Sequence, residues 1–223
     1  MREGRDLSNT NLSGVSLVGL DLSDVGLRAA DLTEADLSGV NLARAVMPGV
    51  NLTRACLVGA NLAGADVRQS RLERAVLTEA DLRGAMLLWA DLRSADLRLA
   101  NLTEADLRGA RLSDADFRRA VLSNANLSEA LLWGTNLEKA ILQEAILIGA
   151  DLSRARCAGA ILWNADLTGA NVHYVDFSDV DLRQTIITPE QLAIVDSLTG
   201  AQLPSDNSLR LRLLRGLSRR KKP

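Results

Sequence analysis

Residues with reactive side chains are few and scattered in this 223-residue chain. It has one histidine, His173, beside its one tyrosine, Tyr174, and two cysteines, Cys56 and Cys157, far apart in the sequence. Acid–base and nucleophilic catalysis require such groups to converge. Aspartates are numerous, but they recur singly at even spacing, whereas Ca²⁺ takes six or more oxygens. We therefore expect no catalytic site, no metal or cofactor site, and two free thiols.

The aspartates belong to a five-residue repeat that dominates the chain. Every fifth residue from Leu7 to Ile187 is apolar, and 30 of these 37 residues are leucine. Alanine usually stands two residues earlier with Asp or Asn between them, as in Ala95, Asp96 and Leu97. Leucines five apart scatter around an α-helix, because each residue turns the helix by about 100°. A short extended piece followed by a two-residue corner instead points Ala and Leu inward and Asp or Asn outward. Repetition then winds the chain into stacked coils, although spacing alone leaves the number of sides open.

The Ala-(Asp/Asn)-Leu-x-x unit resembles the defining unit of the pentapeptide repeat proteins over residues 5–187. The resemblance implies an all-β solenoid, a right-handed quadrilateral β-helix with about 20 residues per coil. About nine coils would form a rod about 45 Å long. At that period Val121, Ile141 and Ile161 would stack on one side, and small Cys157 would lie beneath large Phe177.

The pattern stops after Ile187, and residues 188–204 read as a helical cap. Thr188, Pro189 and Gln191 form a helix start with a capping box, so we predict a short helix through about Leu198. Its apolar residues would cover the last open coil: Leu192, Ile194, Val195 and Leu198. No equivalent cap precedes Asp6, which leaves the first coil either ragged or covered by a partner.

The charge is divided between the repeat region and the C-terminal end. The formal net charge of −2 divides into −6 for residues 1–187 and +4 for residues 188–223. Residues 205–223 form a basic tail whose leucines alternate with arginines. Its composition fits a flexible solubilising end or a basic amphipathic helix for an anionic membrane. The chain has no apolar stretch of about 20 residues and no secretion-signal pattern, so we expect a cytoplasmic protein.

Sorting outward residues at the 20-residue spacing predicts a basic band on two adjacent sides. Acidic Asp91, Asp96 and Asp116 interrupt it, so an ordinary mixed-charge surface is the alternative. The members on one side are Arg54, Arg71, Arg74, Arg93 and Arg111, and those on the next are Arg98, Arg118, Arg119 and Lys139.

A hydrophobic group occupies outward positions where the repeat elsewhere places polar residues. It comprises Val121, Leu131, Trp133, Ile141, Ile146, Ile148, Ile161 and Trp163. Contiguous exposed apolar residues usually mark an interface. A protein partner of unknown identity, a second copy of the chain, or the chain's own C-terminal segment would cover it.

These features favour a non-catalytic solenoid acting as a protein-interaction or structural module. The family also includes fluoroquinolone-resistance proteins that mimic DNA and engage DNA gyrase, which is the alternative the resemblance implies. This chain departs from them in its near-neutral charge, its basic band and tail, and its lack of insertions in the coils. A DNA mimic needs a phosphate-like negative surface, so we rank gyrase engagement second and expect no direct nucleic-acid binding.

Overall fold

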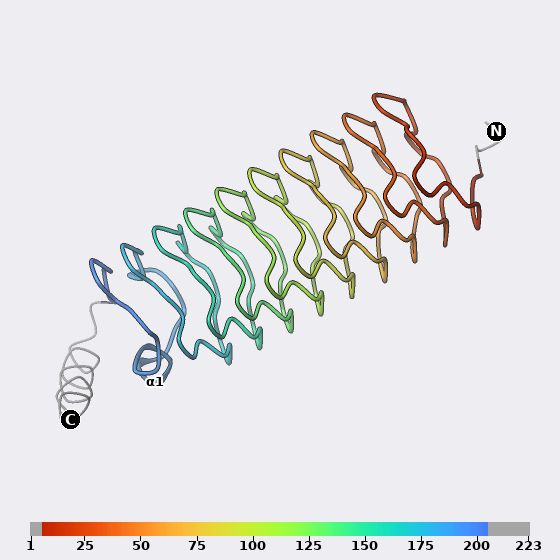
Figure 1. The fold of residues 1–223 in the computed structure, drawn as a ribbon. Coiled ribbons are helices and arrows are strands. Elements are labelled where there is room, and N and C mark those ends of the chain that lie inside the picture. Colours follow the sequence, from red (N-terminus) through yellow and green to blue (C-terminus); the bar gives the residue numbers. More distant parts are fainter. Residues whose placement is uncertain (1–5, 205–223) are drawn as a thin grey trace.

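The computed structural model describes residues 6–204, which form one long rod of stacked coils (Figure 1). Single-residue parallel bridges join the outward residues to those 20 positions later, from Asp6 with Gly26 to Asp166 with Ile186, except that none joins Ile161 to Asp181. Four pentapeptides therefore complete one coil. The predicted stack is confirmed, because Val121 bridges to Ile141 and Ile141 to Ile161.

Each pentapeptide ends in a tight turn that makes one corner of the coil. The carbonyl of the inward leucine accepts a hydrogen bond from the N–H three residues on, as from Ala100 to Leu97 at 3.1 Å. The third residue of the turn has a positive φ, as at Leu99 (φ 61°), which is the mark of a type II turn. At Gly109 a Cβ would lie only 2.3 Å from Cδ1 of Trp89, so this glycine leaves room for the indole ring of the neighbouring coil.

The core consists of columns of leucine and alanine along the rod axis. Leu97 and Phe117 are completely buried, and Cys157 and Phe177 are both buried as predicted. Polar residues at the alanine position bond to a neighbouring coil: the Thr135 hydroxyl donates to the Leu112 carbonyl and the Thr185 hydroxyl to that of Leu162, each at 2.9 Å. The alanine column therefore tolerates threonine, because the hydroxyl finds a backbone acceptor.

The helix α1, Pro189–Leu192, is shorter than predicted. Its capping box is present, with Thr188 and Gln191 bonded reciprocally. The predicted extension to Leu198 is wrong, because the chain returns to the coil register directly after α1: Ser197 bridges to Asp176 and Gln202 to Asp181. These bridges join residues 21 apart, so the segment holds one extra residue per coil.

The apolar residues after Ile187 cover the end of the rod to different degrees. Leu192 and Val195 are buried, whereas Ile194 and Leu198 are partly buried against the core. The stacking therefore continues past residue 187, and residues 188–204 combine a helical turn with a final partial coil.

The other end of the described rod is more open. Leu7 and Leu12 are only partly buried, and Val18 and Leu20 are about half exposed. The predicted basic tail, residues 205–223, lies outside the described residues. Within residues 6–204, no helix is long and apolar enough to cross a membrane.

Candidate interaction surfaces

The bridges define four sides of the rod, which follow one another in chain order. Side A carries Asp106 and Ile146, side B Arg111 and Leu131, side C Asp96 and Asp116, and side D Val121, Ile141 and Ile161. The two turn residues after each inward residue lie at the corner between one side and the next.

The outward Asp and Asn side chains stabilise the turns at the corners of the coil. Every one of them, from Asp6 to Asp181, accepts a hydrogen bond through Oδ1 from the backbone N–H two residues on. A short polar side chain is therefore required by the turn. Among residues 6–204, no group of three or more His, Cys, Asp or Glu is placed to hold a metal ion.

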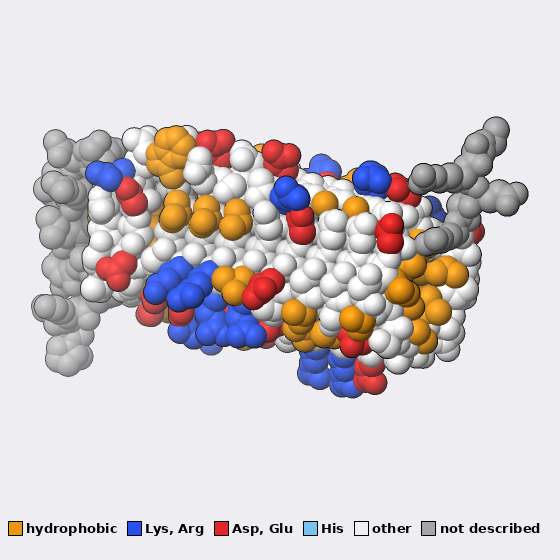
Figure 2. Space-filling view, turned by 90° about the horizontal axis from the view of Figure 1, so that it is seen from above, with side chains coloured by type: hydrophobic (Ala, Val, Ile, Leu, Met, Phe, Trp, Pro, Cys, Tyr) orange, Lys and Arg blue, Asp and Glu red, His pale blue; other side chains and the backbone are white. Residues whose placement is uncertain are grey.

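The hydrophobic group extends over three sides. Ile146 and Ile148 belong to side A, Leu131 and Trp133 to side B, and the rest to side D. Only Val121, Ile141 and Ile161 stack directly, and we call these three residues the apolar row. Ile161 and Trp163 are 48% and 45% exposed, and Val121 and Ile141 are partly buried. Figure 2 shows hydrophobic side chains in a short row along one side of the rod.

The apolar row has a local cost. A valine or isoleucine cannot accept the backbone N–H that Asp or Asn accepts at other corners, so this donor must be solvated there. Three successive coils on one side give up this bond and expose hydrocarbon instead. In return the three side chains stack on one another, which leaves Val121 and Ile141 partly buried and Ile161 48% exposed.

The basic band lies on sides B and C as predicted, but intramolecular pairing neutralises much of it. Arg93, Arg98 and Arg118 each form a two-pronged ion pair with the aspartate two residues earlier, with closest contacts of 2.6–2.7 Å. Arg54 pairs with Glu34 at 3.2 Å, and Arg111 approaches Asp91 at 3.7 Å. The other four members form no ion pair with any residue from 6 to 204: Arg71, Arg74, Arg119 and Lys139.

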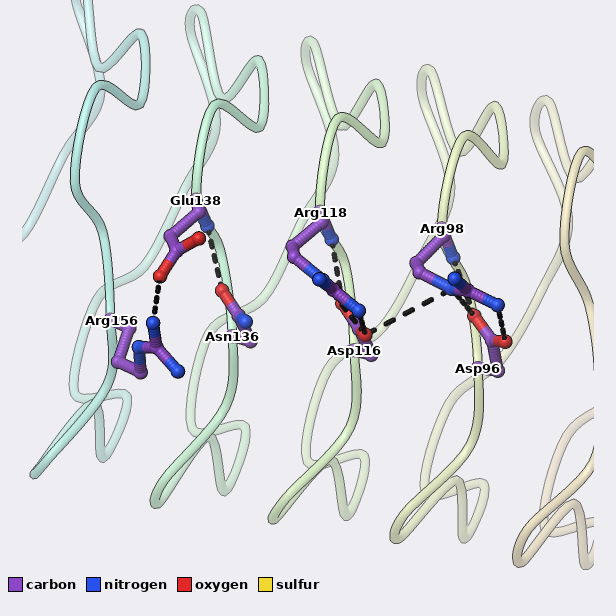
Figure 3. A network of polar contacts seen from close by, with 7 residues as sticks. All are labelled: Asp96, Arg98, Asp116, Arg118, Asn136, Glu138 and Arg156. Carbon is purple, nitrogen blue, oxygen red and sulfur yellow. Dashed lines mark hydrogen bonds and ion pairs between the residues drawn. The ribbon is translucent and has the colours of Figure 1, made fainter.

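On side C the pairs join into a network along the rod (Figure 3). Arg98 contacts both its own Asp96 and, at 3.9 Å, Asp116 of the next coil. Further along, Arg156 pairs with Glu138, whose backbone N–H donates to Asn136. A shallow hollow beside this network is lined by Thr78, Arg98, Leu99, Arg118, Arg119, Glu138 and Lys139. Side C therefore presents a mixed-charge surface with two unpaired cations at its edge.

These pairs predict that acid destabilises the rod. The hydrogen bond from Arg183 lowers the pKa of Asp181 to about 2, and arginines two residues on lower the pKa values of Asp81 and Asp106. A carboxylate with a depressed pKa stabilises the folded state above its unfolded value near 4, and this contribution disappears as the pH falls through the folded value.

We expect the free energy of unfolding to decrease between about pH 4 and pH 2, as measured by urea denaturation at several pH values. Asp81→Asn combined with Asp106→Asn should make this decrease shallower, because asparagine keeps the turn bond but does not titrate. Equal slopes in both proteins would show that these pairs contribute nothing.

The scattered reactive residues remain apart in the structure. His173 and Tyr174 lie on the surface with ring centroids 6.1 Å apart. Cys56 is partly exposed, whereas burial raises the pKa of the Cys157 thiol to about 12. Both thiols are free, as predicted.

Sequence reasoning placed Arg119 and Lys139 in the basic band but missed the acidic corner residues beside the apolar row. Arg119 and Lys139 occupy the corner between sides C and D, and exposed Glu104 and Glu144 occupy the corner between sides D and A. The signal was present, because the second turn residue also recurs every 20 positions. Aligning the second turn residues at the 20-residue spacing predicts opposite charges on the two edges of side D beside the apolar row.

Comparison with known proteins identifies the class. The family model described as pentapeptide repeats matches in eight copies that together cover residues 27–188. This chain therefore belongs to the pentapeptide repeat family. A search of curated proteins found no match.

Two solved structures illustrate the likeness. HetL, a pentapeptide repeat protein involved in heterocyst differentiation regulation in the cyanobacterium Nostoc sp. Strain PCC 7120, is 34% identical over 83% of this chain and 92% of its own, with a TM-score of 0.55. A trypsin-treated variant of QnrB1, a plasmid-mediated fluoroquinolone resistance protein, is 23% identical over 92% of this chain and 96% of its own, with a TM-score of 0.67. The likeness to QnrB1 shows the fold alone.

Proposed function

We propose that this pentapeptide repeat protein is a non-catalytic rod that binds a protein partner through side D. The apolar row carries the proposal, because three stacked coils replace a turn-stabilising Asp or Asn with Val or Ile. Trp163 extends the same surface. Hydrocarbon displayed on a regular, nearly flat side is suited to burial against another folded protein.

The surface charge supports a protein partner over DNA mimicry. Seven outward aspartates are neutralised by the arginine two residues later, at Arg68, Arg83, Arg93, Arg98, Arg108, Arg118 and Arg183. A protein that competes with DNA for a cationic channel needs those carboxylates unpaired. Gyrase engagement is therefore the less supported alternative, and membrane contact would depend on residues 205–223, outside the described rod.

Affinity capture from the native cell tests the proposal. The wild-type rod should retain a specific protein, which includes a second copy of this chain, and Ile141→Lys combined with Ile161→Lys should reduce its recovery about tenfold or more. Asn51→Lys combined with Asn126→Lys is the matched control, because it places the same charges on sides B and A, away from side D. Equal capture by wild type and by both variants would refute the proposed surface.

A further inference from the structure

Beside the apolar row, the two edges of side D carry opposite charges; farther along the rod the order is reversed, with Glu79 and Asp179 on the C–D corner and Arg83 and Arg183 on the D–A corner. On the C–D corner, Arg119 and Lys139 occupy successive coils and are exposed; on the D–A corner, Glu104 and Glu144 are exposed. Figure 2 shows basic side chains next to one edge of the short hydrophobic row and acidic side chains next to the other, while farther along the rod both edges carry both kinds. The apolar row thus lies between a cationic edge and an anionic edge.

The cations on this edge have no intramolecular partner. Neither Arg119 nor Lys139 forms an ion pair or a side-chain hydrogen bond with any residue of the described rod, although most outward arginines do. Glu144 receives only a long bond of 3.4 Å, from the neighbouring Gln143 amide. These charges are available to an external surface of complementary pattern.

We propose that the partner of side D is a second copy of this chain, packed side to side with both rods pointing the same way. This inference rests on the proposed function. A two-fold axis parallel to the rods lies in the interface and exchanges the two edges, so each cationic edge faces the anionic edge of the other copy. The axis keeps every coil at its own level, so each apolar-row residue meets its counterpart.

Residues of opposite charge face each other at three levels, whereas at the level of Val121 the exposed Arg119 faces uncharged Ser123 and Asn124. Lys139 lies opposite Gln143 and Glu144 of the second copy, because these residues flank Ile141 in one coil. Glu138 also lies opposite Glu144, but it is paired with Arg156. Likewise Glu79 faces Arg83, and Asp179 faces Arg183. Each contact between opposite charges occurs twice by symmetry.

Shape agrees at the level of Ile161. Trp163 projects from one edge of that coil and is 45% exposed, whereas the opposite edge carries Gly159. In the parallel arrangement the indole ring faces the glycine of the second copy, which has no side chain to obstruct it. A large exposed aromatic opposite a small residue is typical of an interface anchor.

Like charges also meet, but they are already neutralised. Asp81 lies on the side-D ladder and Asp181 occupies the side-D position after Ile161, and each faces its own counterpart across the axis. Each forms a two-pronged ion pair with the arginine two residues on, with a closest contact of 2.6 Å. An antiparallel dimer centred on Ile141 would instead place Lys139 against Lys139 and Glu144 against Glu144, so the charges select the parallel arrangement.

Sedimentation at micromolar concentration tests the proposal with reciprocal charge reversals. The wild type should sediment as a dimer, whereas Lys139→Glu alone and Glu144→Lys alone should each weaken dimerisation about tenfold or more. An equimolar mixture of the two variants should recover a heterodimer, because both edges are complementary again. A monomeric wild type, unaffected single variants, or a mixture that stays monomeric would each overturn the inference.

A spin-label distance tests the orientation independently. Ala63 lies on side D four coils from Ile141, so Ala63→Cys in a Cys56→Ser background gives one accessible label per chain. A parallel dimer keeps the two labels at one level of the rod, separated by the sheet spacing of about 10 Å and the width of side D, whereas an antiparallel dimer centred on Ile141 separates them by about 40 Å along the rod. The longer distance would contradict the proposal. Capture of a different protein that still depends on Ile141 and Ile161, by a monomeric rod, would leave the proposed function standing and remove only this inference.

Discussion

Leu97→Asp should unfold the rod cooperatively. Leu97 is completely buried in the middle of the leucine column, and its neighbours in the coils on either side are also leucine or phenylalanine. A carboxylate there has no partner within the apolar core, and the desolvation cost of an unpaired buried charge is at least several kcal/mol. Domain stability is only about 5–15 kcal/mol, so we expect loss of the folded signal in circular dichroism at 25 °C.

The matched control for this change lies two residues away. Leu99→Asp makes the same substitution at a corner position that is 48% exposed. Its melting temperature should stay within a few degrees of the wild type, because surface changes usually cost less than about 0.5 kcal/mol. Equal melting of Leu97→Asp and wild type would contradict the inward placement of the leucines.

Gln191→Leu should destabilise the C-terminal end by about 3 kcal/mol or more. The Gln191 amide is buried, and its Nε2 donates to the Leu167 carbonyl at 2.7 Å and the Ala170 carbonyl at 2.9 Å. Its Oε1 accepts from the Thr188 N–H at 2.8 Å. Leucine has similar size but leaves these groups without a partner where water is excluded, and each such loss costs about 1–3 kcal/mol.

Hydrogen exchange measures where this loss falls. Amides of the coil beneath α1 should exchange faster in Gln191→Leu than in wild type, while those around Leu97 should change less, because a solenoid unit contacts mainly its neighbours. Gln202→Leu is the control, since Gln202 is exposed and only its backbone bridges to the rod. Similar exchange in the two variants would mean that the Gln191 side chain does not seal the coil end.

The core was predictable from the sequence because a five-residue period leaves few ways to bury leucine. The inward columns, the stack of Val121 on Ile141, and the free thiols all follow from position within the repeat. The helix end was not predictable, because Ile194 and Leu198 continue a helix-like apolar pattern while the open coil offers competing backbone partners. Only the structure shows that Ser197 and Gln202 form bridges to the last coil and that the helix does not continue to Leu198.

The sequence predicts the positions of the candidate surfaces on the rod, but not how much of their charge is left unpaired. The basic band lies where the 20-residue spacing put it, yet the pairing of Asp96 with Arg98 depends on the turn, which brings these two side chains together. Counting the arginines and lysines of the basic band from the sequence therefore overestimates the positive charge that is available to a partner. The anionic edge at Glu104 and Glu144 was not predicted, although these two turn residues lie 40 positions apart, which is a multiple of the 20-residue coil.

The most direct test of side D as the binding surface is site-specific photo-crosslinking in the native cell. A photoreactive amino acid is placed in turn at Ser123, Gln143 and Trp163 beside the apolar row, and at Ser113 and Ser128 on sides B and A. The account predicts one crosslinked protein product at the first three positions and little or none at the other two. Equal crosslinking at all five positions, or none beside the apolar row, would contradict it.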